Sequence, residues 1–289
     1  MNRKWLLEFV KFLPQGTVSR AWGWLAQRQS PRSAITLLKK TFVRRMGIDL
    51  SDSQKDLDEF ATLEDLFVRT LKEGARPIDA DPLAVVSPVD GLVGATGMVS
   101  DNTLLQVKGR CYCLSKLLDA PIEASRYEGG AYCTIYLAPH NYHRVHTPLA
   151  GTIREASVIP GCLLPVFSES VENVDELFAR NERLITYMDT ETAGRMAVIK
   201  VGATMVGRIQ VTYDESLRTN VSGQGRRVLH YDPATSLQKG DELGAFLLGS
   251  TVILLAEAGR VSFDVTSGSL VRVGERIGTI LSRTTNSMS

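Results

Sequence analysis

Cysteine and long apolar runs are both scarce in this sequence of 289 residues. Its four cysteines form no Cys-x-x-Cys pair, which excludes a zinc ribbon and a disulfide-rich secreted scaffold and favours reduced thiols. The longest uncharged stretch of interest, residues 243–256, has 14 residues, whereas a membrane-spanning helix needs about 20. Because that stretch contains two glycines and a cluster of β-branched residues, it predicts a pair of buried strands.

Other classes of protein are excluded by further absences. The net charge is only +1 and 44% of the residues are hydrophobic, so the chain is not disordered. Neither a Walker A sequence nor a G-x-G-x-x-G motif between a strand and a helix occurs, so nucleotide binding has no support. Glu8 and Lys11 interrupt the apolar stretch that a signal peptide would need, and we therefore expect a cytoplasmic chain.

The small net charge conceals an uneven distribution. Residues 1–45 contain ten basic side chains against one acidic side chain, and they also contain all three tryptophans, Trp5, Trp22 and Trp24. The rest of the chain is acidic on balance. A basic, aromatic-rich head on an acidic body indicates contact with an anionic partner, either a nucleic acid or a phospholipid surface.

Three helices are predicted before residue 80. Residues 4–13 place Trp5, Phe9 and Phe12 on one helical face. Two interpretations stay open for this segment: an interfacial helix whose apolar side chains enter a lipid surface, or an ordinary helix packed on its own domain. A second helix is predicted from Ser30-Pro31, with serine as cap and proline in the first helical position, to Met46-Gly47.

The third helix is expected to begin after Thr62. Asp65 follows this threonine at the spacing of a capping box, and the apolar side chains Leu63, Leu66 and Leu71 fall on the inner face. We expect this helix to end near Gly74, because glycine commonly terminates helices.

Most of the glycines lie after residue 90. Twenty of the 24 glycines lie in residues 91–289, where they separate short β-branched runs. The runs are residues 131–138, 196–201, 205–211, 246–255, 261–265 and 270–280. Short strands with glycine-bearing turns are typical of a barrel or a sandwich. The predicted fold class is therefore α+β, with a basic helical region at 1–80 and a β-rich body at 81–289.

Three of the four histidines, His140, His143 and His146, lie between Pro139 and Pro148. Imidazoles could bind a metal, but this spacing drifts around a helix, and no H-E-x-x-H motif or distant cysteine pair completes a site. General acid–base chemistry is favoured over a metal. Histidines on a polar loop without a chemical role are the structural alternative.

Two further features allow a chemical interpretation. Ser250 follows Gly249 inside an apolar run, but residue 252 is valine, so this is not the G-x-S-x-G elbow of hydrolases. By itself a Gly-Ser pair in a strand is more typical of a bulge than of a nucleophile. Asp90 precedes Gly91, and such a pair alone is typical of a turn.

Taken together, these motifs resemble those of bacterial phosphatidylserine decarboxylases. The similar segments are Leu248-Gly249-Ser250-Thr251, His143-Arg144-Val145-His146 with Pro148, Ser87-Pro88-Val89-Asp90-Gly91, and residues 67–78 and 201–207. The resemblance covers roughly residues 30–285, and the Leu-Gly-Ser-Thr block is its most specific element. One departure is Asn141, where the family has an aspartate, and this position is peripheral to the chemistry.

The resemblance implies an enzyme that makes its own cofactor. The Ser250 hydroxyl would attack the Gly249 carbonyl, with His146 as the base and Asp90 orienting it. The products would be a chain 1–249 and a chain 250–289 blocked by a pyruvoyl group derived from Ser250. This covalent cofactor would form a Schiff base with the amine of phosphatidylserine, and His143 would exchange the substrate proton.

The resemblance also implies a β-rich body similar to the barrel-sandwich hybrid of biotinyl and lipoyl domains, with no resident metal. The expected partners are phosphatidylserine and an anionic membrane surface, not nucleic acid, with the enzyme peripheral to the cytoplasmic side of the membrane. The two cleaved chains would form a heterodimer, and two heterodimers could associate. Arg144 and the basic head are candidates to bind the phosphate. The alternatives are a pyruvoyl decarboxylase of a soluble amino acid and a non-catalytic membrane- or RNA-binding protein.

Overall fold

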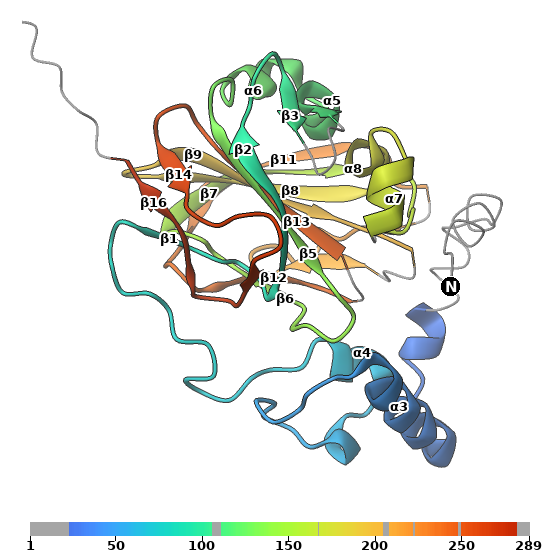
Figure 1. The fold of residues 1–289 in the computed structure, drawn as a ribbon. Helices are drawn as coiled ribbons and strands as arrows, with labels where there is room; N and C mark the ends of the chain where they lie inside the picture. Colours follow the sequence, from blue (N-terminus) through green and yellow to red (C-terminus); the bar gives the residue numbers. More distant parts are fainter. Residues whose placement is uncertain are drawn as a thin grey trace, which may run out of the picture.

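The computed structural model describes residues 23–105, 111–166, 168–204, 208–221, 223–247 and 250–281. They form a β-rich body with a helical part at one end, which contains the first described residues (Figure 1). The chain is therefore α+β, as the sequence predicts. The amphipathic helix predicted for residues 4–13 lies outside the described residues, so both of its interpretations stay open.

One antiparallel sheet of eight strands organises the body, in the order β11-β7-β8-β9-β13-β5-β2-β15. Its strands are β11 (Arg227–Leu237), β7 (Gly151–Ile159), β8 (Arg183–Thr190), β9 (Gly194–Val201), β13 (Ser250–Ala256), β5 (Ala131–Leu137), β2 (Gly91–Met98) and β15 (Leu270–Val271). In the described part of the chain this sheet and the smaller ones stay open. The expected β-rich body is present, without the closure of a barrel.

Three smaller sheets and four short helices complete the body. The sheets are β1 (Ala84–Val86) with β16 (Arg276–Ile280) and β14 (Val261–Phe263); β10 (Ile209–Val211) with β12 (Glu242–Phe246) and β6 (Arg144–His146); and β3 (Thr103–Leu105) with β4 (Cys111–Cys113). The helices are α5 (Leu114–Leu118), α6 (Pro121–Ser125), α7 (Ser168–Asn173) and α8 (Leu177–Arg180). The two buried strands predicted for residues 243–256 are confirmed as β12 and β13, which belong to different sheets.

The helical part contains α3 (Arg32–Met46), the short 3₁₀ helix η1 (Leu57–Glu59) and α4 (Leu63–Phe67). Helix α3 ends where the sequence predicts, because Gly47 adopts φ +67° and its N–H bonds to the Val43 carbonyl. Its start differs by one residue: Pro31 is the N-cap and no side chain caps the helix, so Ser30 does not have the predicted capping role. None of the described helices is long and apolar enough to cross a membrane.

Helix α4 begins where the sequence predicts but ends earlier than predicted. The Thr62 hydroxyl accepts the Asp65 N–H at 2.9 Å, which confirms the cap. The helix stops at Phe67, however, and the predicted end near Gly74 is wrong. Beyond it, Leu71 forms an isolated antiparallel bridge with Ser53. This non-local pairing outweighs the local helical pattern.

Two apolar cores lie on opposite faces of the large sheet. Because side chains alternate along a strand, β13 contributes Val252 and Leu254 to one core and Ile253 and Leu255 to the other. The first core lies against the smaller sheets, and the second lies against α5 and α8. Every residue of β13 is buried, which explains its uninterrupted apolar sequence.

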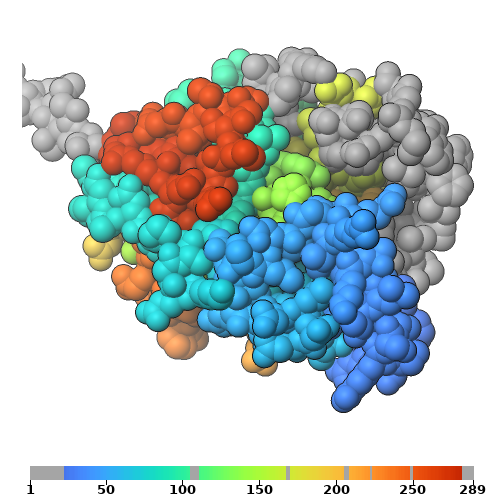
Figure 2. Space-filling model, turned by 60° about the horizontal axis from the view of Figure 1, so that its bottom comes forward, coloured from blue at the N-terminus to red at the C-terminus, as the bar shows by residue number. Residues whose placement is uncertain are grey.

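The C-terminal strands lie beside the segment that leaves the helical part. The Asp79 N–H donates to the Gly274 carbonyl at 2.9 Å, and the Val273 N–H donates to the Asp90 carboxylate at 2.9 Å. Figure 2 shows the helical part in blue and the C-terminal segment in orange-red on the same face of the molecule. This face therefore combines segments from both ends of the described chain.

Strand β9 carries a lysine that is completely buried in the core. The Lys200 ammonium group donates to the Thr186 hydroxyl at 2.7 Å and to the Val198 carbonyl at 3.3 Å. Among the described residues it has no acidic partner. Burial consequently lowers the pKa of Lys200 from 10.5 to about 7.

Replacing this lysine tests the cost of its burial. We expect Lys200→Met to raise the free energy of unfolding at pH 7 by about 3 kcal/mol, because each pKa unit corresponds to about 1.4 kcal/mol and part of the gain is offset by a lost hydrogen bond. Between pH 7 and 10.5 the unfolded wild type binds more protons than the folded form, so its stability rises with pH. Denaturant titrations should therefore show the advantage of the variant shrinking towards pH 10. An advantage that does not change with pH would contradict this explanation.

Candidate active site

Ser250 is the first residue of β13, and the strand pairing fixes its position. It lies opposite Leu137 of β5, and the next residue, Thr251, lies opposite both Tyr136 of β5 and Val201 of β9. The Ser250 side chain is fully buried, and among the described residues its hydroxyl has no hydrogen-bond partner. A buried hydroxyl without a partner is costly and is therefore expected at functional positions. Leu248 and Gly249 lie outside the described residues.

His143 is held where β12 ends. Its carbonyl accepts the Phe246 N–H at 2.9 Å, and its ring packs on Phe67 of α4 with the ring centroids 4.2 Å apart. Nδ1 lies 2.8 Å from the Asn141 carbonyl. Because a carbonyl can only accept, Nδ1 carries the proton and Nε2 is a buried acceptor without a partner. Burial lowers the pKa of His143 to about 3, so the imidazole is neutral.

His146 is also neutral and is held at both ring nitrogens. Nδ1 lies 2.8 Å from the Gly240 carbonyl, which places the proton on Nδ1. Nε2 then accepts a hydrogen bond from the Tyr142 hydroxyl at 3.2 Å. Burial is the main cause that lowers the pKa of His146, and it raises the pKa of Tyr142 to about 12. Tyr142 therefore occupies the nitrogen that would act as the base.

Asp90 is buried, and its carboxylate is bound by Arg76. The guanidinium donates from Nε at 3.0 Å and from Nη2 at 2.7 Å, and it also pairs with Asp52 at 2.9 Å. These bonds raise the pKa of Arg76. The main-chain N–H of His146 donates to the Pro88 carbonyl at 2.8 Å, so the structure brings the segment around Asp90 beside the segment around His146.

The four predicted residues are not connected into a relay in this structure. Nδ1 of His146 contacts a main-chain carbonyl and not the Asp90 carboxylate. The Ser250 hydroxyl forms no hydrogen bond with either histidine. The roles assigned to Asp90, His143, His146 and Ser250 stay predictions, and the orienting contact between Asp90 and His146 is absent from this state of the chain.

Sequence reasoning missed three residues that the structure places at the site: Arg69, Arg76 and Tyr142. The sequence offered only their positions as a signal, since Arg69 and Arg76 lie in the family-like segment 67–78 and Tyr142 directly precedes His143. Arg144, a candidate to bind phosphate, is already neutralised. Its Nη1 contacts both carboxylate oxygens of Glu242 at 2.8 and 2.7 Å, and its Nε donates to the Val68 carbonyl at 2.9 Å.

An apolar cavity of about 220 Å³ adjoins the start of β13. Its lining includes Thr251, Tyr136, Leu92, Val171 and Phe178. In one wall, a hydrogen bond of 2.8 Å from the Ser267 hydroxyl to the Gly94 carbonyl joins residues 267–268 to β2. Thr251 directly follows Ser250 in β13, and successive side chains of a strand point to opposite faces of the sheet, so the Ser250 side chain does not face this cavity.

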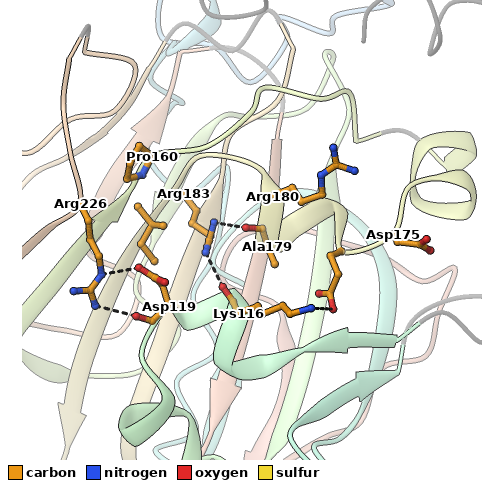
Figure 3. Close-up of a pocket in the computed structure, with 10 residues that line it drawn as sticks. Lys116, Asp119, Pro160, Asp175, Ala179, Arg180, Arg183 and Arg226 are labelled. Carbon is orange, nitrogen blue, oxygen red and sulfur yellow. Dashed lines mark hydrogen bonds and ion pairs between the residues drawn. The ribbon is translucent and has the colours of Figure 1, made fainter.

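Another cavity, of about 580 Å³, lies at the C-terminal ends of α5 and α8 (Figure 3). The buried Arg183 guanidinium donates to the carbonyls of Lys116, Leu117, Ala179 and Asn181 at 2.6–2.8 Å. Arg226 pairs with Asp119 at 2.7 Å, and Lys116 pairs with Glu176 at 3.3 Å. None of the predicted site residues lines this cavity, and its interactions join two helix ends to the sheet.

No group of three or more histidine, cysteine, aspartate or glutamate side chains in the described ranges is placed to hold a metal ion. The neutral imidazoles and the buried serine at this site are instead suited to proton transfer and nucleophilic chemistry.

Comparison with known proteins decides the family. The family model for phosphatidylserine decarboxylase matches residues 63–279. The chain belongs to the phosphatidylserine decarboxylase family. The match includes Asp90, both motif histidines and Ser250, so the resemblance inferred from the motifs is confirmed.

Curated relatives in the family match this chain over nearly its full length. The phosphatidylserine decarboxylase proenzyme of Anaeromyxobacter sp. (strain K) is 44% identical, over 96% of this chain and 99% of the relative. The proenzyme of Myxococcus xanthus is 41% identical, over 97% and 100%. That of Brevibacillus brevis is 40% identical, over 96% and 99%.

The contact between Tyr142 and His146 gives a testable pKa. A hydrogen bond donated to Nε2 exists only while the imidazole is neutral, so it lowers the pKa of His146. We expect Tyr142→Phe to raise that pKa, measured by NMR titration of the imidazole C–H signals in a Ser250→Ala background. The signals of the exposed His230 provide the internal reference in both proteins. A lower or unchanged pKa of His146 would contradict the assigned tautomer.

Proposed function

We propose that this protein converts phosphatidylserine to phosphatidylethanolamine through a pyruvoyl group that it makes from Ser250. The observation that carries the proposal is a fully buried, unpartnered serine hydroxyl at the first residue of a central strand, in a chain that belongs to this family. The printed name of the relatives, proenzyme, supports a precursor that is processed.

The chain would process itself at the bond between Gly249 and Ser250. The Ser250 oxygen attacks the Gly249 carbonyl carbon, the peptide C–N bond breaks, and the nitrogen takes up a proton. Loss of the Cα proton of residue 250 then expels the Gly249 carboxylate. Hydrolysis of the remaining dehydroalanine releases ammonia and leaves the ketone. His146 is the proposed base, and it requires Tyr142 to yield Nε2 to the Ser250 hydroxyl.

A pyruvoyl group at this position supplies a ketone that condenses with the substrate amine and draws electrons from the bond to the carboxylate. The residues around it would manage the protons. His143 offers a buried lone pair on Nε2, fixed in direction by the bond from Nδ1 to the Asn141 carbonyl. We propose that this nitrogen exchanges the proton at the substrate carbon.

A lipid is favoured over a soluble amino acid as the substrate. Exposed apolar side chains occur in the helical part, where Trp24 is 60% and Leu37 is 67% accessible, and a decarboxylase of a free amino acid would not need them. The Arg28 guanidinium lies 3.5 Å above the Trp24 ring, so cationic and aromatic groups occur together there.

We propose that this helical part contacts the anionic cytoplasmic surface of the membrane, with the enzyme attached peripherally. Helix α3 has Arg44 and Arg45 in its last turn and no acidic residue in its first turn. Each cation near an anionic surface contributes about 1 kcal/mol to binding. The cleaved chains would stay together as a heterodimer, because β13 of the small chain is paired on both sides with strands of the large chain.

The central test is the mass of the purified protein. The wild type should appear as chains 1–249 and 250–289, the smaller one lacking its amino group and reacting with hydrazines. Ser250→Ala should stay intact and release no CO₂ from phosphatidylserine vesicles, because no oxygen is present to open the peptide bond.

Thr251→Val is the matched control for this test, because it removes the neighbouring hydroxyl, which is equally buried and unpartnered. The Thr251→Val protein should still be cleaved between Gly249 and Ser250. Cleavage of Ser250→Ala at this bond would refute self-processing by Ser250. CO₂ release from free serine but not from vesicles would instead favour a decarboxylase of a soluble amino acid.

The membrane proposal has its own variant. Trp24→Ser combined with Leu37→Ser should weaken co-sedimentation with anionic vesicles several-fold while self-cleavage continues, because the apolar contacts to the lipid are lost. Ile122→Ser is the control, since Ile122 is 89% accessible but belongs to α6, at the other end of the body (Figure 1). Equal vesicle binding by all three proteins would contradict a role for this surface.

A further inference from the structure

Arg69 is a buried cation whose hydrogen-bonding capacity is largely unused. It follows α4 directly, and only 5% of its surface is accessible. Its Nη2 donates to the carbonyls of His140 and Asn141 at 3.1 and 3.3 Å. Its Nε and Nη1 are buried and have no hydrogen-bond partner in the part of the chain that the structure describes. A buried guanidinium without an anion is costly, so this arrangement indicates a missing negative partner.

The carboxylates around Arg69 do not supply that partner. Asp90 is the strongest favourable charge acting on it, but the Asp90 carboxylate is held by Arg76, which itself repels Arg69. Asp49 accepts the Ser51 N–H at 2.9 Å. Within the described ranges no ion pair joins Arg69 to an acid. Burial is the dominant effect on this guanidinium and lowers the pKa of Arg69.

Three other buried or half-buried arginines, two at the site and Arg183 of the larger cavity, have full sets of partners. Arg144 has both carboxylate oxygens of Glu242, and Arg76 has Asp90 and Asp52. Arg183 has four main-chain carbonyls. Arg69 alone in this set keeps two nitrogens without a partner.

One carbonyl oxygen joins Arg69 to His143. The Asn141 carbonyl accepts from Nη2 of Arg69 at 3.3 Å and from Nδ1 of His143 at 2.8 Å. The unpartnered nitrogens of Arg69 are therefore close to the imidazole that we propose exchanges the substrate proton. An anion bound to Arg69 would belong to the molecule that reacts beside His143.

We propose that Arg69 binds the phosphodiester group of the phospholipid substrate through one of its two unpartnered nitrogens, an inference that rests on the proposed function. Nη2 is already bonded, and the N–H groups of Nε and Nη1 point away from each other, so the expected contact is a single charge-assisted hydrogen bond to a phosphate oxygen. The substrate carboxylate is the less suitable anion, because it must leave as CO₂, and pairing it with a guanidinium would stabilise the ground state. The phosphate keeps its charge throughout the reaction, so binding it does not slow the chemical step.

The test compares two substrates that differ in the phosphate. Glycerophosphoserine has it, and the O-propyl ether of serine does not. Arg69→Met should lower kcat/KM for glycerophosphoserine by about 30–100-fold, as expected for a lost hydrogen bond to a charged group, mainly through KM. It should leave kcat/KM for the propyl ether within about threefold of the wild type. Arg69→Lys should fall between the two proteins, because it keeps the charge but cannot hold the His140 and Asn141 carbonyls and the phosphate in the same planar arrangement.

A binding measurement separates the sources of phosphate and does not depend on turnover. Calorimetry with the mature wild type should show binding of glycerophosphoethanolamine, weaker binding of inorganic phosphate, and loss of both in Arg69→Met. Equal affinity for the two ligands would mean a site for free phosphate and would overturn the assignment to the lipid. Arg144→Met is the matched control and should not discriminate between the two substrates, because that guanidinium is already paired.

The failures of the inference and of the proposed function are distinguishable. If Arg69→Met lowers kcat/KM for both substrates equally, Arg69 only supports residues 140–141, and the phosphate assignment is overturned while the decarboxylase stands. If the wild type contains no ketone and releases no CO₂ from either substrate, the proposed function itself is wrong, and the binding data decide the role of Arg69 alone.

Discussion

The pairing of β13 on both sides is the constraint on which the site depends. Because β5 and β9 bind this strand along its length, its first residue is held at a fixed register and its side chain is buried. Leaving a buried hydroxyl without a partner costs about 1–3 kcal/mol, which the surrounding pairing and apolar packing offset. The short strand β12 leads towards this point, and β6 pairs with β12, so the histidine motif is brought beside the end of β12 by the same hydrogen-bond network.

Burial and charge pairing together set the chemical character of the site. Both motif histidines are neutral, and their tautomers are fixed by the main-chain carbonyls of Asn141 and Gly240. Asp90 and Glu242 are neutralised by the guanidinium groups of Arg76 and Arg144. What is left is the buried hydroxyl of Ser250, two neutral imidazoles and the guanidinium of Arg69, which has no carboxylate partner among the described residues. This combination favours an anionic ligand and proton transfer within an enclosed space.

Local sequence signals predicted helix boundaries correctly where the deciding contacts are local. The Thr62 cap and the Gly47 terminus depend on contacts within a few residues, and both are present. The end of α4 depends on Leu71 bridging Ser53 and on Val68 accepting from Arg144, which lies 76 residues away. A capping pattern cannot report such contacts, so the predicted helix was too long. The apolar runs at 131–138 and 196–201 correspond to β5 and β9, but β7, β8 and β11 were not predicted, because their sequences mix polar and apolar residues.

The sequence by itself determined the α+β class, the two buried strands around residue 249 and the family to which the chain belongs, because these follow from residue types and short spacings. Only the tertiary structure decided the partners of each reactive group. The Asp90 carboxylate accepts the N–H of Val273, which lies 183 residues later in the chain. The Arg69 guanidinium donates to the carbonyl of Asn141, which lies 72 residues later. The physical reason is that a hydrogen bond depends on distance and direction, which the strand register and the packing of the helical part fix, whereas a motif specifies only which atoms are available.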